Sequence, residues 1–159
     1  MKNQEEKTNA MRLLEQKKIK YISHTYDSTK ALSGLEVAHV LSQDPNKVFK
    51  TLVTEAKSLN HYVFLVPVDK ELDLKKGAKA VNEKSLSMLK SKDLLGLTGY
   101  IHGGCSPIGM KKFFKTVIDI SAQNFETIIF SGGKIGYQIE TSLEELKKAI
   151  PFSMADIVV

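Results

Sequence analysis

The sequence predicts an α+β domain, and three observations lead to that fold class. Strand-like and helix-like segments alternate irregularly, several strand pairs are close enough to form hairpins, and no repeat or linker divides the 159 residues. Irregular alternation is typical of a mixed sheet with helices packed around it, and not of a doubly wound parallel sheet. We therefore expect a single domain over residues 1–159.

The first third of the chain predicts a helix, a strand and a second helix. Residues 8–17 have a suitable N-cap and an apolar side, which predicts a helix. The β-branched and aromatic residues of 20–26 predict a strand. After a polar loop, Ser33 and Glu36 have the spacing of a capping box, which predicts a helix over 34–41.

The middle of the chain holds the two clearest strand patterns, at 48–54 and 61–68, joined at hairpin distance through 57–60. A helix is expected over 73–81, opened by an aspartate that can act as its N-cap. The remaining elements are expected to be short: strands near 85–89, 116–119, 127–130 and 137–140, a helical turn at 93–97, and a helix that starts with a second capping-box pattern at 142–145 and ends before Pro151.

Composition indicates a soluble globular protein. Hydrophobic residues make up 42% of the chain and charged residues 26%, and no apolar run approaches the length of a membrane span. The first residues have no apolar segment of the kind found in signal peptides, so we expect a cytoplasmic protein. A single cysteine, Cys105, allows no internal disulfide, and the four histidines lack metal-ligand spacing, so no metal site is expected.

The charge balance favours a polyanionic partner. The formal net charge is +5, and all 23 basic residues except Arg12 are lysines. Lysines act as point charges on phosphate and not as bidentate readers of base edges. This pattern favours contact with an RNA backbone and does not suggest DNA as a partner.

Two glycine-rich segments are the strongest local signals for a site. In the first, residues 100–112, Gly103 and Gly104 allow backbone amides to approach a ligand, and lysines follow at once. A tight connection between strands is the plain alternative. A second segment, residues 131–136, begins with Ser131-Gly132 and favours the interpretation as a site. The serine hydroxyl and the backbone amides of this segment could lie beside the first loop.

Lys50 is the third signal, because it stands inside a strand pattern. Alternation places Val48, Lys50 and Leu52 on one face and Phe49 and Thr51 on the other. A lysine between apolar residues either extends its head to water or serves as a cation at the floor of a pocket. Both interpretations remain open from the residues alone.

Other reactive side chains give no catalytic constellation. His102 could act as a general base or be a surface histidine, and Cys105 could be a nucleophile or a small buried thiol. The chain has neither the GxSxG elbow of α/β-hydrolases nor the phosphate loop of NTPases. The residues therefore predict a site of backbone donors, hydroxyls and one lysine.

Taken together, six ordered motifs resemble the YbaK family of bacterial aminoacyl-tRNA deacylases, which is related to the editing insertion domain of prolyl-tRNA synthetase. The resemblance spans nearly the whole chain. The motifs are His24-Thr25-Tyr26-Asp27, Asp44-Pro45-Asn46-Lys47-Val48-Phe49-Lys50-Thr51-Leu52, Leu72-Asp73-Leu74-Lys75-Lys76, Thr98-Gly99-Tyr100, Gly103-Gly104-Cys105-Ser106-Pro107-Ile108-Gly109-Met110-Lys111-Lys112 and Phe125-Glu126-Thr127-Ile128-Ile129-Phe130-Ser131-Gly132-Gly133-Lys134.

The resemblance implies a mixed, curved, barrel-like β-sheet with surrounding helices and a pocket for the aminoacylated 3′ end of tRNA. The implied activity is trans-editing hydrolysis of mischarged Cys-tRNA(Pro), without a cofactor, in which the thiol of the bound cysteine attacks its own ester. Editing is needed because cysteine and proline are too similar in size for one pocket to separate them. The implied partners are aminoacyl-tRNA(Pro) and prolyl-tRNA synthetase, with no membrane.

The resemblance also assigns residues. It ties Lys50 most closely to activity, and it implies pocket positions at Tyr26, Thr51, Gly103 and Ser131. Gly104 and Gly132 extend the two glycine turns of that pocket. The lysines that flank the turns, and are expected to contact tRNA, are Lys111, Lys112 and Lys134.

This chain departs from the family pattern at two positions. Cys105 stands where an aliphatic residue is commoner, so we interpret it as a packing residue, and His102 stands where an apolar residue is commoner. Alternative functions are deacylation of Ala-tRNA(Pro) or of a broader set of small amino acids. A tRNA-binding module without catalysis is the alternative from a different class.

Overall fold

The computed structural model describes residues 7–30 and 32–159, whose strands form two sheets. A three-stranded antiparallel sheet has the order β1-β7-β6, and a five-stranded mixed sheet has the order β4-β2-β3-β5-β8, in which β5 runs parallel to both neighbours. The strands are β1 (Ile22–Thr25), β2 (Phe49–Ala56), β3 (His61–Pro67), β4 (Leu86–Met88), β5 (Lys115–Asp119), β6 (Ile128–Ser131), β7 (Tyr137–Thr141) and β8 (Ser153–Ala155).

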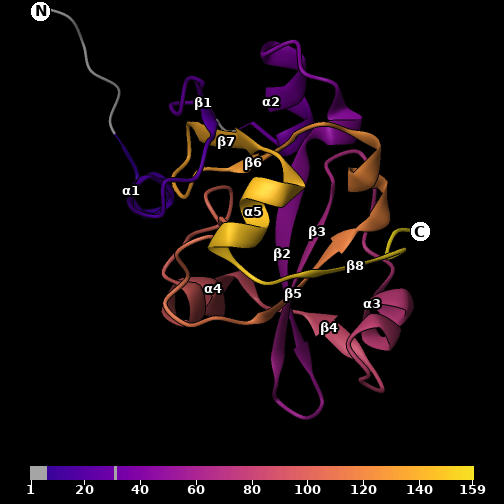
Figure 1. Ribbon diagram of the computed structural model, residues 1–159. Helices are drawn as coiled ribbons and strands as arrows, with labels where there is room; N and C mark the ends of the chain where they lie inside the picture. The colour runs from indigo at the N-terminus through magenta and orange to yellow at the C-terminus, as the bar shows by residue number, and fades with distance from the viewer. Residues whose placement is uncertain (1–6, 31) are drawn as a thin grey trace, which may run out of the picture.

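The predicted α+β class is confirmed, but the two sheets do not close into a barrel. Between them the described strands share a single isolated bridge, from Val48 just before β2 to Ile129 in β6. A barrel needs a continuous ladder around all its strands, whereas here β1, β4 and β8 remain sheet edges. Figure 1 shows the long β2–β3 hairpin crossing the molecule, with the smaller sheet beside its upper end.

The helices follow the capping signals of the sequence. Thr8 caps α1, Ser33 forms a complete capping box with Glu36 at α2, and Asp73 and Ser142 cap α3 and α5. None of the described helices is long and apolar enough to span a bilayer. The helices are α1 (Asn9–Gln16), α2 (Gly34–Val40), α3 (Leu74–Ala80), α4 (Ser91–Thr98) and α5 (Leu143–Ala149), with 3₁₀ turns η1 (Pro45–Lys47) and η2 (Ile120–Asn124).

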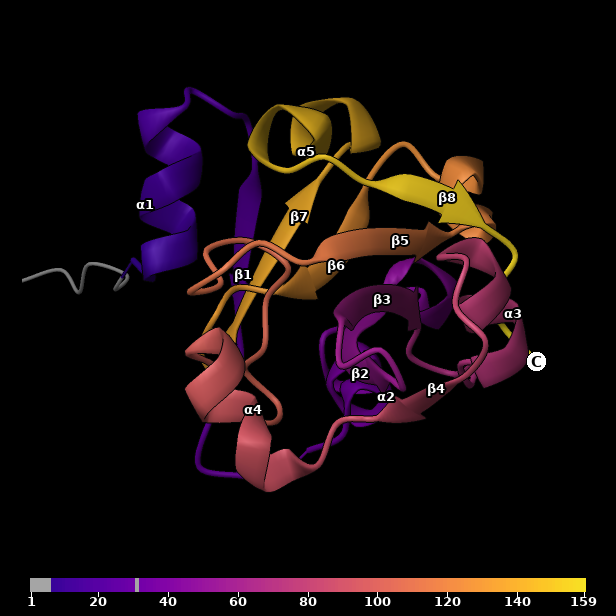
Figure 2. The same cartoon turned by 90° about the horizontal axis from the view of Figure 1, so that it is seen from below.

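The main core lies between the two sheets and is closed by α1 and α5. It receives Met11 and Leu14 from α1, Phe49 from β2, Phe130 from β6 and Leu146 from α5. Figure 2 shows α1 and α5 on the side of β1 and β7, and α3 near β4 at the opposite side. A second apolar cluster packs α3 against the other face of the larger sheet, through residues that include Phe64, Ala78 and Val117.

A third, small cluster sits where the two sheets meet. Ala38 of α2 packs on Val48 and Ile129, with Val68 at its margin. This cluster places α2 over the junction of β2 and β6. The junction matters for function because the strand residues that follow the bridge belong to the motifs singled out in the sequence.

Candidate functional site

Lys50 lies just beyond the junction of the two sheets, as the second residue of β2. Phe49 and Val53 point into the main core, while Leu52 packs against the second cluster, so the predicted alternation is confirmed. The Lys50 side chain is 30% exposed, and its Nζ lies 3.8 Å from Oε2 of Glu71, which is 84% exposed. So exposed a pair is worth about 0–1 kcal/mol, which leaves the ammonium group available to an anionic ligand.

Ser131 belongs to the same face of the junction. The bridge joins Val48 to Ile129 in parallel, and Lys50 and Ser131 each follow it by two residues. Because alternate residues of a strand share a face, both lie on the side of the strands that carries Val48 and Ile129. The parallel register therefore brings together two predicted site residues that are 81 positions apart in the sequence.

Thr51 does not share this face with Lys50. It lies on the side of Phe49 and Val53, and its Oγ1 is buried without a hydrogen-bond partner among the described residues. Leaving a buried hydroxyl unpaired costs about 1–3 kcal/mol. The Thr51 side chain therefore points away from the Lys50 ammonium group, although the two residues are neighbours in β2.

The two glycine-rich segments pack directly against each other. A Cβ atom on Gly104 would lie 3.1 Å from the backbone nitrogen of Ile135 and 3.3 Å from Cα of Lys134, so only glycine allows the approach. Tyr26 joins the same region, since its N–H donates to the carbonyl of Gly136 at 2.9 Å. The structure thus brings the first glycine loop, the second turn and the end of β1 together.

Several of the amides expected to face a ligand are already used inside these segments. The N–H of Gly104 donates to Ile101, that of Gly132 to Tyr137, and that of Gly133 to the hydroxyl of Ser131. The expectation that both turns present a set of free N–H donors is therefore wrong for these three groups. Hydrogen bonds that hold each turn in shape take up the donors.

Cys105 is a packing residue. It is 7% exposed within the main core, and burial, opposed by a hydrogen bond with Thr98, raises the pKa of its thiol to about 12. A thiol with such a pKa carries almost no thiolate at neutral pH, so it is a poor nucleophile. His102, by contrast, is exposed at the start of the glycine loop.

The sequence patterns did not predict a charged network on one face of the smaller sheet. The Glu140 carboxylate accepts hydrogen bonds from Lys47 at 2.9 Å and Thr127 at 2.5 Å, and it pairs with Nε2 of His24 at 2.7 Å. Burial alone raises the pKa of Glu140, but the hydrogen bonds from Thr127, His24 and Lys47, with the charge of Lys47, lower it to about 2. No sequence spacing signals the network, because its members come from four separate segments.

A second missed contact ties the end of α2 to the smaller sheet. Nε2 of Gln43 donates to Oε1 of Gln138 at 2.7 Å, and Gln138 is buried opposite Ser131 in the β6–β7 register. Gln138, Ser131 and Glu140 alternate with core-facing residues, so they share the face that α2 covers. The candidate site is therefore a polar face with Lys50 at one margin.

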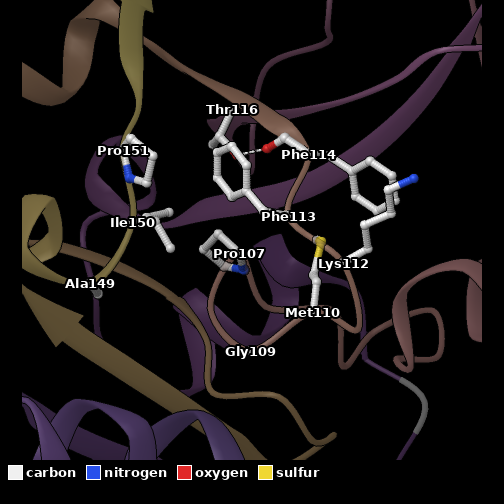
Figure 3. Close-up of a pocket in the computed structure, with 10 residues that line it drawn as sticks. All are labelled: Pro107, Gly109, Met110, Lys112, Phe113, Phe114, Thr116, Ala149, Ile150 and Pro151. Atoms are coloured by element: carbon white, nitrogen blue, oxygen red, sulfur yellow. Dashed lines mark hydrogen bonds between the residues drawn. The ribbon is translucent and has the colours of Figure 1, made fainter.

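The three flanking lysines lie in different surroundings. Lys134 is next to Gly104 in space, and its Nζ lies 5.7 Å from the centre of the Tyr137 ring. Nζ of Lys111 donates to the carbonyl of Gly96 at 3.4 Å. Lys112 lines a separate cleft of about 310 Å³ beside α5, shown in Figure 3.

Among residues 7–30 and 32–159, no group of three histidine, cysteine, aspartate or glutamate side chains is arranged to hold a metal ion. What the face does offer is the weakly paired ammonium group of Lys50, the hydroxyl of Ser131 and a set of hydrogen-bonded polar groups. Such groups can orient an ester and stabilise negative charge on its oxygen atoms.

Known proteins resemble this chain in sequence and in fold. The chain is 45% identical over 157 residues to an Enterococcus faecalis protein, EbsC, which is named as a candidate Cys-tRNA(Pro)/Cys-tRNA(Cys) deacylase. The alignment covers 98% of this chain and 96% of that protein. A solved candidate trans-editing enzyme for prolyl-tRNA synthetase has a TM-score of 0.80 at 21% identity, over 96% of this chain and 98% of that one.

A further solved structure shares the same fold. The hypothetical protein APE2540 has a TM-score of 0.83 at 20% identity, over 93% of this chain and 97% of that one. Residues 30–149, which contain Lys50 and both glycine turns, match the model of the aminoacyl-tRNA editing domain. The chain therefore belongs to the aminoacyl-tRNA editing domain family.

Proposed function

We propose that this protein hydrolyses the aminoacyl ester of mischarged Cys-tRNA(Pro), acting in trans to prolyl-tRNA synthetase. The observation that carries the proposal is the ammonium group of Lys50, which is half-buried on a polar face. Among residues 7–30 and 32–159, its one ion-pair partner is the exposed carboxylate of Glu71, 3.8 Å away. The E. faecalis relative supports the choice of a cysteinyl ester.

The proposed chemistry needs no nucleophile from the protein. The sulfur of the bound cysteine attacks the carbonyl carbon of its own ester, the bond from that carbon to the ribose oxygen breaks, and the thiol proton ends on that oxygen. Water then opens the cyclic thioester. Lys50 stabilises the negative charge that develops on the ester oxygens, an interaction worth about 2–4 kcal/mol in a partly desolvated site.

The decisive experiment compares aminoacyl-tRNA esters that differ in the amino acid or in the tRNA. Cysteinyl-, seryl-, alanyl- and prolyl-tRNA(Pro), together with cysteinyl-tRNA(Cys), are incubated with the protein, and the remaining ester is measured over time. We expect loss of both cysteinyl esters and persistence of the seryl ester, because replacing sulfur by oxygen removes the attacking thiol.

Other outcomes would select a different function. Faster cleavage of alanyl-tRNA(Pro) would contradict the substrate-assisted step and favour a small-amino-acid deacylase. Binding without cleavage of any ester would favour a tRNA-binding module. Cys105→Ser serves as the control for the protein's own thiol: turnover should stay within about tenfold of wild type, and a covalent adduct on Cys105 would contradict the proposal.

A further inference from the structure

The cleft beside α5 is apolar and carries an exposed aromatic ring. Its walls come from the loop before β5 and from the end of α5, and Figure 3 shows the rings of Phe113 and Pro151 facing each other across it, with Ile150 and Pro107 near its floor. The volume of about 310 Å³ lies at the small end of the range for ligand pockets. The cleft can therefore take one flat group.

Phe113 is held in place although it is 54% exposed. Its neighbour Phe114 is buried in the main core and meets the ring of His61 edge-on, with ring centres 5.8 Å apart. Oγ1 of Thr116 also donates to the carbonyl of Phe114 at 2.9 Å. An aromatic ring on such a fixed backbone loses little conformational entropy when a ligand stacks on it.

The wall of the cleft carries one positive charge and no negative one. Lys112 lines the cleft and no acidic residue does, and among residues 7–30 and 32–159 Lys112 forms no ion pair. The lysines of the last turn of α5 are already engaged: Nζ of Lys147 lies 5.7 Å from the centre of the Phe152 ring, and Lys148 pairs with Glu145 at 2.8 Å. An apolar slot with an unpaired lysine beside it matches an unpaired nucleotide, whose base stacks on an aromatic ring while its phosphate meets the lysine.

We propose that this cleft is a second RNA subsite, which stacks an unpaired base of the tRNA substrate on Phe113. The inference rests on the proposed function for the identity of the RNA. The loop supports it, because Gly104 touches the Lys134 turn while Pro107 and Met110 of the same loop line the cleft. The hydrogen bond from the Tyr100 hydroxyl to the carbonyl of Ile108, at 2.5 Å, ties the start of the loop to its second half.

The chain contains no tryptophan, which permits a direct test. Phe113→Trp introduces a single fluorophore into the cleft, and Leu59→Trp, at a hairpin position that is 72% exposed, serves as the matched control. Both variants are titrated with a short single-stranded RNA ending in CCA and with a blunt RNA duplex. We expect the single strand to quench the first variant only, and the duplex to quench neither.

A second measurement uses full-length tRNA that carries no amino acid. Phe113→Ala should weaken its binding about tenfold, the usual effect of removing one stacked base, and Phe113→Tyr should restore most of it. Leu59→Ala should bind like wild type. In deacylation assays the alanine variant should raise KM more than it lowers kcat.

Two outcomes would overturn the inference. Equal quenching of both tryptophan variants, or wild-type RNA affinity of Phe113→Ala, would show that the ring does not stack on RNA. Loss of binding to prolyl-tRNA synthetase with unchanged RNA binding would assign the cleft to a protein partner. If Phe113 governs RNA binding but no ester is cleaved, the proposed function fails and this subsite stands.

Discussion

At the scale of single residues, the environment of Lys50 separates a functional role from a structural one. Within the part of the chain that the structure describes, its side chain makes one weak ion pair, with Glu71, so removing it takes away little folding energy. A lysine kept half-buried without a strong partner is costly unless a ligand supplies the counter-charge. Lys50 is thus the residue whose substitution distinguishes activity from stability most clearly.

We expect Lys50→Ala to lower kcat/KM by about 30- to 1000-fold, corresponding to about 2–4 kcal/mol of lost charge stabilisation. The melting temperature should change little. Lys57→Ala, at an exposed position in the β2–β3 turn, is the control and should retain full activity. Near-normal turnover by a folded Lys50→Ala protein would rule out the proposed role of this residue.

At the scale of elements, the close packing of the two glycine segments can be tested by replacing one glycine inside the contact and one outside it. Gly104→Ala places a methyl group 3.1 Å from the backbone of Ile135, which cannot move aside cheaply, so stability should fall by about 1–3 kcal/mol. In Gly96→Ala the methyl group meets nothing within 4 Å inside α4, so stability should rise by about 0.5–1 kcal/mol. Urea unfolding of both variants measures the difference, and equal effects would contradict the packing described.

The Glu140 network predicts a dependence of stability on pH. The pKa of Glu140 is lowered to about 2 in the folded protein, so its contribution to stability is present above the unfolded pKa of about 4.5 and is lost as the pH falls toward 2. Glu140→Gln should reduce the free energy of unfolding by about 2–3 kcal/mol at pH 7.

The same variant should approach the wild type in acid. Urea unfolding at pH 7, 4 and 3 gives the comparison, with Glu144→Gln as an exposed control from the start of α5. A gap between wild type and Glu140→Gln that stays constant over this range would mean that the network does not stabilise the fold through the ionised carboxylate.

Elements with local signals were predictable, and those that depend on distant partners were not. Thr8, Ser33, Asp73 and Ser142 mark helix starts because a cap acts within four residues. Strand β8 was missed because its three residues are defined only by pairing with β5. The Glu140 network was missed for the same reason, since Lys47 and Glu140 are 93 residues apart.

The candidate site shows the same division. Alternation in β2 predicted correctly that Lys50 and Thr51 face opposite sides. The bridge between Val48 and Ile129, which sets Ser131 near Lys50, leaves no mark in the sequence. A curved, barrel-like sheet was expected from the resemblance, whereas the described strands form two sheets whose ladders are joined by that bridge alone.

At the scale of the whole molecule, the net charge of +5 predicts salt-dependent binding of tRNA. Each neutralised phosphate releases counterion, so KM should rise steeply with salt, while the chemical step in the bound complex should change much less. Replacing Lys111, Lys112 or Lys134 by glutamine should raise KM and reduce the salt slope by about one per phosphate contact. Single-turnover rates at saturating protein separate the two effects. A KM that does not change with salt concentration would mean that these lysines form a solvated surface and do not contact tRNA.

The pairing of β1 with β7 has a consequence for how the protein is made. Ile22 in β1 pairs with Glu140 in β7, so β1 cannot form its ladder until a strand 118 residues further along the chain has been synthesised. At about 5–20 residues per second, the ribosome needs about 6–24 s to supply it. A nascent chain stalled before β7 lacks the face that carries Gln138 and Glu140, whereas the β2–β3 hairpin is already complete. The larger sheet can therefore begin to form early during translation, and the candidate site is assembled among the last parts of the molecule.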